Sequence, residues 1–91
     1  MMAENPKQQK IDALYELIAG LKNAEDCRAL FADLCTFKEI EKMAERVYAA
    51  RQLMEGKTYS QVIAETDISS ATLSRVSRCV QYGSGYSRLL K

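Results

Sequence analysis

Hydrophobic residues recur at helical spacing along most of the 91-residue chain. Between residues 7 and 21 they follow steps of three and four, which predicts one amphipathic helix. The apolar stripe consists of Ile11, Leu14, Tyr15, Ile18 and Leu21. Leu17 widens this stripe beyond what a lone helix needs to bury.

Cap residues predict a second and a third helix. Asn23 can cap a helix whose apolar stripe is Cys27, Leu30, Phe31 and Leu34. Thr36 followed three residues later by Glu39 has the spacing of a capping box, and a long helix should run from there to Glu55. Its inward residues are expected to be Ile40, Met43, Ala44, Val47, Ala50, Leu53 and Met54. Gly56 is a natural stop for it.

Two short helices separated by a tight break should follow. Thr58 can cap a helix over residues 59–65, and Ser69 can cap another over residues 70–80, with Asp67 in the break. So short a connection forces the two helices to cross steeply, as in a helix-turn-helix. The segment "YGSGYS" should end the second of these helices, and "YSRLLK", residues 86–91, can form a last helical turn. The pattern predicts an all-α fold of five to six short helices, one domain over residues 1–91, with the helix-turn-helix at about 58–80.

The second helix of this pair is expected to have an apolar and a polar face. Val62, Ile68, Leu73 and Val76 are spaced to pack the pair against the long helix, and Ala71 is small enough for a close approach. The residues left exposed would be Ser70, Thr72, Ser74, Arg75, Ser77 and Arg78.

Such a face suits a DNA major groove. Short hydroxyl side chains enter a groove of about 12 Å without steric conflict, and arginine is the side chain best suited to guanine or phosphate. The start of the preceding helix would lie near the flanking backbone. The predicted DNA-contacting residues are Tyr59, Ser60, Gln61, Ser69, Ser70, Thr72, Ser74, Arg75 and Arg78.

The charge distribution supports this reading more than the net charge of +1 does. Residues 1–45 carry six basic and nine acidic side chains, whereas residues 46–91 carry seven basic and three acidic ones. From Ile68 onward there are four basic residues and no acid. A basic end on a near-neutral chain is a localised footprint for nucleic acid. The low total charge keeps open an alternative, a helix-turn-helix-shaped module that binds proteins and not DNA.

Other functional classes lack their required residues. The chain has no histidine and no CxxC pair, so neither a metal site nor an enzyme is expected, and the three cysteines are interpreted as packing thiols. No apolar stretch approaches the roughly 18 residues needed to cross a bilayer, and "MMAENPKQQK" is not a secretory signal. We therefore expect a cytoplasmic protein without membrane contact.

Residues 36–78, "TFKEIEKMAERVYAARQLMEGKTYSQVIAETDISSATLSRVSR", together with the following "YGSGY", resemble the Trp repressor superfamily. The similarity is closer to its small bacterial branch, the YerC/YecD type. The resemblance implies an intertwined, all-helical homodimer that binds a near-palindromic DNA operator as a transcriptional regulator, typically a repressor. Its dimer interface would include Leu14, Leu17, Ile18, Phe31 and Leu34.

The resemblance also raises the question of a corepressor. Tryptophan-sensing members hold their ligand between two arginines, with a threonine nearby, and the matching residues here are Arg46, Arg75 and Thr36. These members have glycine where this chain has Val76, and a β-branched side chain should fill part of the slot. No cofactor is expected. A small corepressor stays open, but tryptophan is disfavoured.

Overall fold

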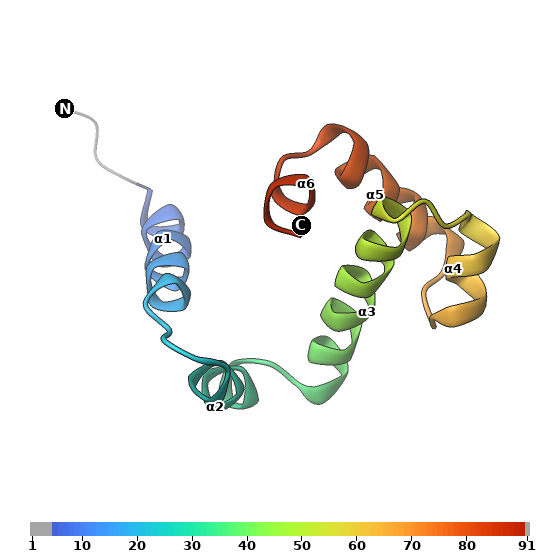
Figure 1. Cartoon of the computed structure of the whole chain (residues 1–91). Coiled ribbons are helices and arrows are strands. Elements are labelled where there is room, and N and C mark those ends of the chain that lie inside the picture. The colour runs from blue at the N-terminus through green and yellow to red at the C-terminus, as the bar shows by residue number, and fades with distance from the viewer. Residues whose placement is uncertain (1–4, 91) are drawn as a thin grey trace. The chain divides into compact units, whose positions relative to one another are not determined.

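The computed structural model describes residues 5–90, which form helices joined by short turns and contain no strand (Figure 1). In this range the helices are α1 (Pro6–Ala19), α2 (Ala24–Leu34), α3 (Phe37–Met54), α4 (Tyr59–Glu65), α5 (Ser70–Tyr82) and α6 (Gly85–Leu89). The predicted all-α fold is confirmed. The bounds of α4 agree with the sequence-based ones, and α5 continues two residues further than expected.

Side-chain caps explain where several helices begin. The Asn23 side chain accepts a hydrogen bond from the Asp26 amide at 2.8 Å, and Ser69 does the same for Thr72 at 3.2 Å. Thr58 forms a complete capping box with Gln61. These contacts satisfy amides that the helix itself leaves without partners.

The chain separates into two compact units, Met1–Thr36 and Phe37–Lys91. The first unit consists of α1 and α2, and neither helix has a buried residue. The second consists of α3 to α6. The prediction of one domain over residues 1–91 stays a prediction.

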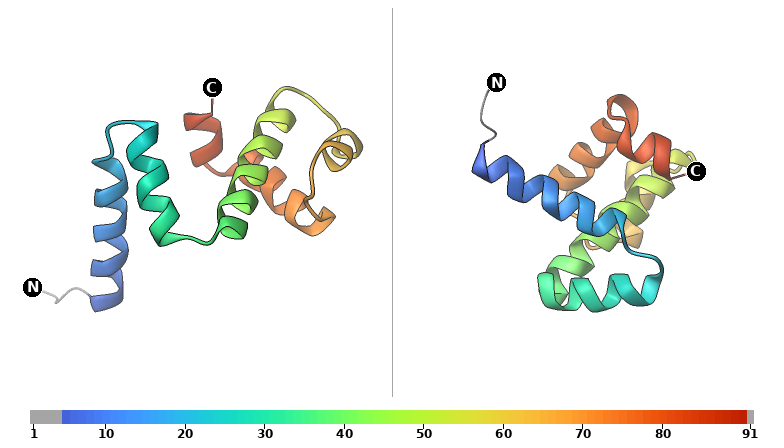
Figure 2. Two further views of the ribbon diagram at one scale, coloured as in Figure 1. Left: turned by 90° about the horizontal axis from the view of Figure 1, so that it is seen from below. Right: turned by 90° about the vertical axis from the view of Figure 1, so that its left-hand side faces the viewer.

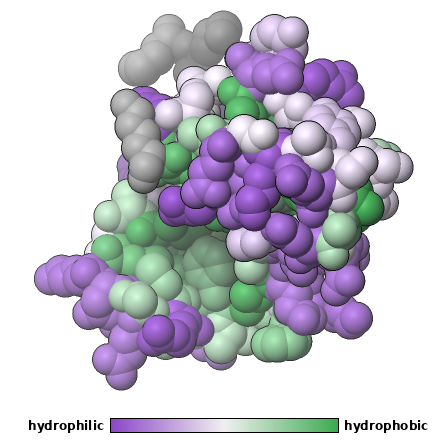
Figure 3. Space-filling view, turned by 45° about the vertical axis from the view of Figure 1, so that its right-hand side comes forward, coloured by the Kyte–Doolittle hydropathy of each residue, from purple (hydrophilic) through white to green (hydrophobic). Residues whose placement is uncertain are grey.

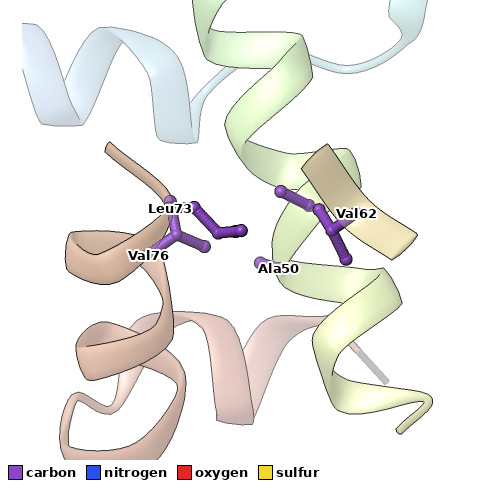
Figure 4. Packing of buried hydrophobic residues seen from close by; sticks show 5 residues of the cluster. Ala50, Val62, Leu73 and Val76 are labelled. Carbon is purple, nitrogen blue, oxygen red and sulfur yellow. The ribbon is translucent and has the colours of Figure 1, made fainter. Parts of the chain in front are cut away.

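The core of the second unit lies where α3, α4 and α5 meet. Ala49 and Ala50 of α3, Val62 of α4, and Leu73 and Val76 of α5 are at most 1% exposed. Figure 4 shows Ala50, Val62, Leu73 and Val76 meeting between these helices. Both views of Figure 2 place α5 beside α3, and α5 is the main packing partner of α3. Around this core pack Leu53, Ile68, Val80, Tyr86 and Leu90. The predicted packing of the two-helix unit on the long helix is therefore correct.

The predicted inward face of the long helix was too broad. Ala44 is exposed, and Val47 and Met54 are 38% and 37% exposed. Ala49, which the pattern did not place inside, is fully buried. Ala71 is exposed, so the prediction that it permits the close approach is also wrong. The small residues that let helices meet closely are instead Ala49 and Ala50, on α3.

The turn after α3 and the turn after α4 end their helices in different ways. Gly56 has a φ of +95°, a left-handed conformation that suits glycine and ends α3 as predicted. No non-glycine residue in the described range, Asp67 included, has a positive φ. The turn between α4 and α5 closes without it. The Thr66 hydroxyl donates to the Val62 carbonyl at 2.9 Å and so ends α4.

Gly83 lies between α5 and α6, where its backbone passes close to the Cys79 carbonyl group. A Cβ at this position would lie 2.7 Å from the carbonyl oxygen of Cys79. Only glycine fits there without a shift of the chain. This turn brings Tyr86 and Leu90 back onto the core.

Several large apolar side chains remain open to solvent in the described range. Phe37, Tyr82 and Leu89 are at least 70% exposed. In Figure 3, hydrophobic residues, drawn in green, form part of the visible surface. Among residues 5–90, no helix is both long and apolar enough to cross a membrane.

Candidate nucleic-acid interface

The faces of α5 differ in burial and in chemistry. Leu73 and Val76 are buried in the core, while Ser70, Ser74, Arg75 and Arg78 are exposed. None of these four exposed side chains has a hydrogen-bond or ion-pair partner in the described part of the chain. The structure thus leaves two arginines and two short hydroxyl side chains free to meet a ligand, as the sequence predicted.

Ser77 differs from this expectation. It was predicted to be exposed with the other polar residues of α5, but it is only 6% exposed. It lies four positions after Leu73, which is about one helical turn further along the inward face. Its hydroxyl oxygen accepts a hydrogen bond from the Gln81 amide at 3.5 Å. Ser77 is therefore part of the packing, which polar character alone could not reveal.

The first turn of α5 uses its hydroxyl groups for its own structure. Ser69 Oγ accepts from the Thr72 amide and donates to Thr72 Oγ1 at 3.1 Å. Ser69 is exposed, and Thr72 is half-buried. Both remain at the predicted surface, but their hydroxyl groups already have partners. Ser70 and Ser74 have the freer side chains.

The start of α4 presents the other predicted contacts. Tyr59 is 45% exposed, and Ser60 and Gln61 are exposed. Gln61 Oε1 accepts from the Thr58 amide at 2.8 Å, which leaves its NH₂ group to donate outward. This geometry suits contact with phosphate oxygens, which accept hydrogen bonds and do not donate them.

A groove of about 640 Å³ lies between the first half of α3 and the turn that leads into α5. It is lined by four basic and three acidic side chains, and its neutral lining residues include Ser69 and Thr72. The basic residues are Lys38, Lys42, Arg46 and Arg75. The first three follow one another at intervals of four on α3, so they share a face of that helix. Lys38 and Lys42 were not among the predicted site residues, although this spacing could have indicated them.

A second pocket, of about 530 Å³, shares Arg46 and Arg75 with the groove. Its other walls come mainly from α5 and α6 and include Val76, Cys79 and Tyr86. Within the described residues neither guanidinium has an ion-pair partner. The two arginines of the predicted ligand set, Arg46 and Arg75, therefore line the same pocket. Thr36 belongs to the other unit, and its role stays a prediction.

Three side chains meet where α4 ends, and we call them the Glu65 cluster: Tyr48, Lys57 and Glu65. The Tyr48 hydroxyl donates to Glu65 Oε2 at 3.2 Å, and Lys57 Nζ lies 3.2 Å from both carboxylate oxygens. The hydrogen bond to Glu65, followed by desolvation and the carboxylate charge, raises the pKa of the Tyr48 phenol. This cluster connects α3, the turn after it and the last residue of α4.

The remaining candidates for a chemical site are metal-ligating side chains and cysteine thiols. Among residues 5–90, no group of three or more metal-ligating side chains comes together. Cys27, Cys35 and Cys79 are all free thiols, and Cys27 is the exposed one.

Comparison with known proteins decides the family. The family model described as Trp repressor protein matches residues 9–91. The chain belongs to the Trp repressor family.

Individual relatives agree with this assignment. The uncharacterized protein YerC of Bacillus subtilis strain 168 is 43% identical over 83 residues, which cover 91% of this chain and 80% of YerC. A Trp repressor candidate from Staphylococcus aureus, known from a crystal structure, has a TM-score of 0.84 at 34% identity and covers 97% of this chain and 92% of its own. A TrpR-like protein from Eubacterium eligens has a TM-score of 0.84 at 36% identity, with coverages of 90% and 86%.

Membership in the Trp repressor family confirms the resemblance seen in the sequence, including that to the YerC-type branch. The fold is that of DNA-binding regulators and not of enzymes. This supports a role in transcription regulation and agrees with the expectation of no catalytic activity.

Proposed function

We propose that the protein is a homodimeric transcriptional repressor in the cytoplasm, which binds a near-palindromic DNA operator and presents one α5 to each half-site. The observation that carries this proposal is the division of α5. Its apolar side is fixed in the core by Leu73 and Val76, while Arg75 and Arg78 stand exposed and have no partner among residues 5–90. A rigid helix with free arginines on the opposite side is well suited to reading base edges.

The dimer is supported by the exposed apolar residues of α1 and α2. Leu17 and Leu34 are 52% and 50% exposed, and Leu14, Ile18 and Phe31 are only half-buried. Two helices without a buried side chain gain too little to offset the entropy lost on ordering them. A second copy of the chain would cover these residues and supply the missing core.

The experiment is operator selection from a random duplex pool, followed by affinity measurements on the selected sequence. Arg75→Ala and Arg78→Ala should each weaken specific binding by about 1–3 kcal/mol if the guanidinium contacts a base, with unchanged helical content. Arg51→Ala, which removes an exposed arginine from α3, is the matched control and should bind like the unchanged protein. Equal affinity of all three variants would contradict the assignment of α5.

The same measurement addresses the protein-interaction alternative, which the net charge of +1 favours. A protein that neutralises several phosphates loses affinity steeply as salt rises. No binding to any duplex at about 50 mM salt, a concentration at which phosphate contacts are strong, would replace the repressor proposal with the interaction module.

We also propose that tryptophan is not the corepressor. Val76 is 1% exposed, packs in the core and also lines the pocket that contains Arg46 and Arg75. A ligand that binds the folded state raises the melting temperature with its concentration. Tryptophan should leave the melting temperature unchanged, and a concentration-dependent rise would overturn this part of the proposal.

A further inference from the structure

Helix α4 is attached to the rest of its unit at few points. It has seven residues, and Val62 is its one buried side chain. At its end, Glu65 receives hydrogen bonds from Tyr48 of α3 and from Lys57 of the preceding turn. The Glu65 cluster is therefore the main polar attachment of this helix to its surroundings.

Stabilisation of α4 itself does not explain the carboxylate. Glu65 is the last residue of the helix, where the helix dipole disfavours negative charge and a basic residue would be preferred. Its side chain gains two partners from outside the helix instead. The ion pair is also partly open to solvent, with side-chain exposures of 35% and 39%. Pairs of this kind contribute little to stability.

The position of Lys57 gives the cluster a consequence for DNA binding. Lys57 immediately precedes Thr58 and the three predicted backbone contacts Tyr59, Ser60 and Gln61. A lysine there could reach a phosphate beside those residues. In the structure, however, its ammonium group is within 3.2 Å of both oxygens of Glu65, at the other end of the helix.

We propose that Glu65 is a positioning residue that holds the Lys57 ammonium away from the DNA backbone and thereby limits sequence-independent affinity. This inference rests on the proposed DNA-binding function. Non-specific binding comes essentially from phosphate neutralisation, so one withheld cation lowers it directly. Base reading by α5 is unaffected, because Arg75 and Arg78 belong to a different helix.

The test is the salt dependence of binding to a random-sequence duplex, measured on the full-length protein. Glu65→Gln removes the charge that retains Lys57 but keeps an acceptor for Tyr48. Each newly contacted phosphate should steepen the slope of log affinity against log salt by about 0.9 for each bound subunit, with tighter binding at low salt. Circular dichroism should show the same helical content as the unchanged protein.

Two controls separate this effect from a general change in charge. Glu55→Gln makes the same charge change in the turn after α3, where Glu55 is exposed and bonds to neither partner of the cluster, and should not steepen the slope. In the double variant Lys57→Met/Glu65→Gln, the steeper salt slope and the tighter binding at low salt should both vanish. The double variant should therefore bind like Lys57→Met alone.

Three results would overturn the inference alone, with the unchanged protein still binding DNA in a salt-sensitive way. They are a Glu65→Gln slope no steeper than that of Glu55→Gln, a gain that persists without Lys57, and weaker binding by a folded Glu65→Gln protein. Absence of binding by the unchanged protein and by every variant would instead overturn the proposed function and this inference together.

Discussion

Residues 5–36 and residues 37–90 are both built of capped amphipathic helices, but only the second range contains buried side chains. In the second, α4 and α5 each place apolar residues against the alanines of α3. In the first, the stripe of α1 is equally apolar in sequence, yet Leu17 and Tyr15 are more than half exposed. The difference teaches that helical pattern and capping decide where helices form, whereas stability requires a second surface to cover the stripe.

The largest expected effect tests the core directly. Leu73→Ala should lower the free energy of unfolding by about 2–5 kcal/mol, because it leaves a cavity between α3, α4 and α5. This loss should be independent of protein concentration. Leu17→Ala, a truncation of the same kind on α1, should cost about 0.5 kcal/mol or less at high dilution, and more as concentration rises. Denaturant titrations at several protein concentrations would measure both losses. A loss for Leu17→Ala that does not change with protein concentration would contradict the contrast between the two ranges.

A second substitution tests how much the turn between α5 and α6 contributes to the stability of the second unit. Gly83→Ala places a Cβ 2.7 Å from the Cys79 carbonyl, so we expect a loss of about 1–3 kcal/mol through a shift of α6. Gly85→Ala is the matched control, because its Cβ would meet no atom within 4 Å. Thermal unfolding should separate the two variants clearly. Similar melting temperatures would mean that α6 adapts without cost.

A third substitution tests the first range. Leu17→Asp places a charge on the stripe that a second copy is proposed to cover, so the dimer dissociation constant should rise at least about tenfold, or about 1.4 kcal/mol. Gln9→Asp puts the same charge on an exposed position of α1 outside the predicted interface and should leave it unchanged. Light scattering over a dilution series measures both. A monomer at all concentrations in the unchanged protein would remove the dimer proposal.

The smallest effect concerns a bond outside the core. The hydrogen bond from Tyr48 to Glu65, then desolvation and the nearby charge, raise the pKa of the phenol above its usual 10.0. A raised pKa in the folded state means that the contribution to stability is present below the unfolded value and is lost as pH rises through the folded one. In an ultraviolet titration of the folded protein, Tyr48→Phe should remove a late-titrating tyrosine. Loss of an early one would contradict the hydrogen bond.

Local chemistry made the second unit the more predictable one from sequence. Thr58, Ser69 and Gly56 act through hydrogen bonds and backbone angles within a few residues, so their roles could be read directly. Burial depends on partners far along the chain, and here the predictions failed. Ala49 and Ser77 were not expected inside, and Ala44 and Ala71 were not expected outside. Small residues give no hydrophobic pattern strong enough to distinguish the two cases.

The candidate site divides in the same way. The exposed arginines of α5 followed from helical spacing, because Leu73 and Val76 fix which face is buried. The Glu65 cluster could not be anticipated, since its members lie eight and seventeen residues apart and meet only when α4 folds back on α3. The stripe of Lys38 and Lys42 was readable from spacing, but it gained meaning only beside the turn that contains Asp67.

The three free thiols, finally, make the protein its own chemical reporter. Cys27 is exposed on α2, whereas Cys35 and Cys79 are half-buried. A thiol-selective dye should therefore modify Cys27 first, without any engineered label. Because Cys27 lies in the range that lacks its own core, the rate of this modification would follow how completely a second molecule shields that surface. Assembly could thus be timed by simple absorbance, in the same sample that is used to measure binding.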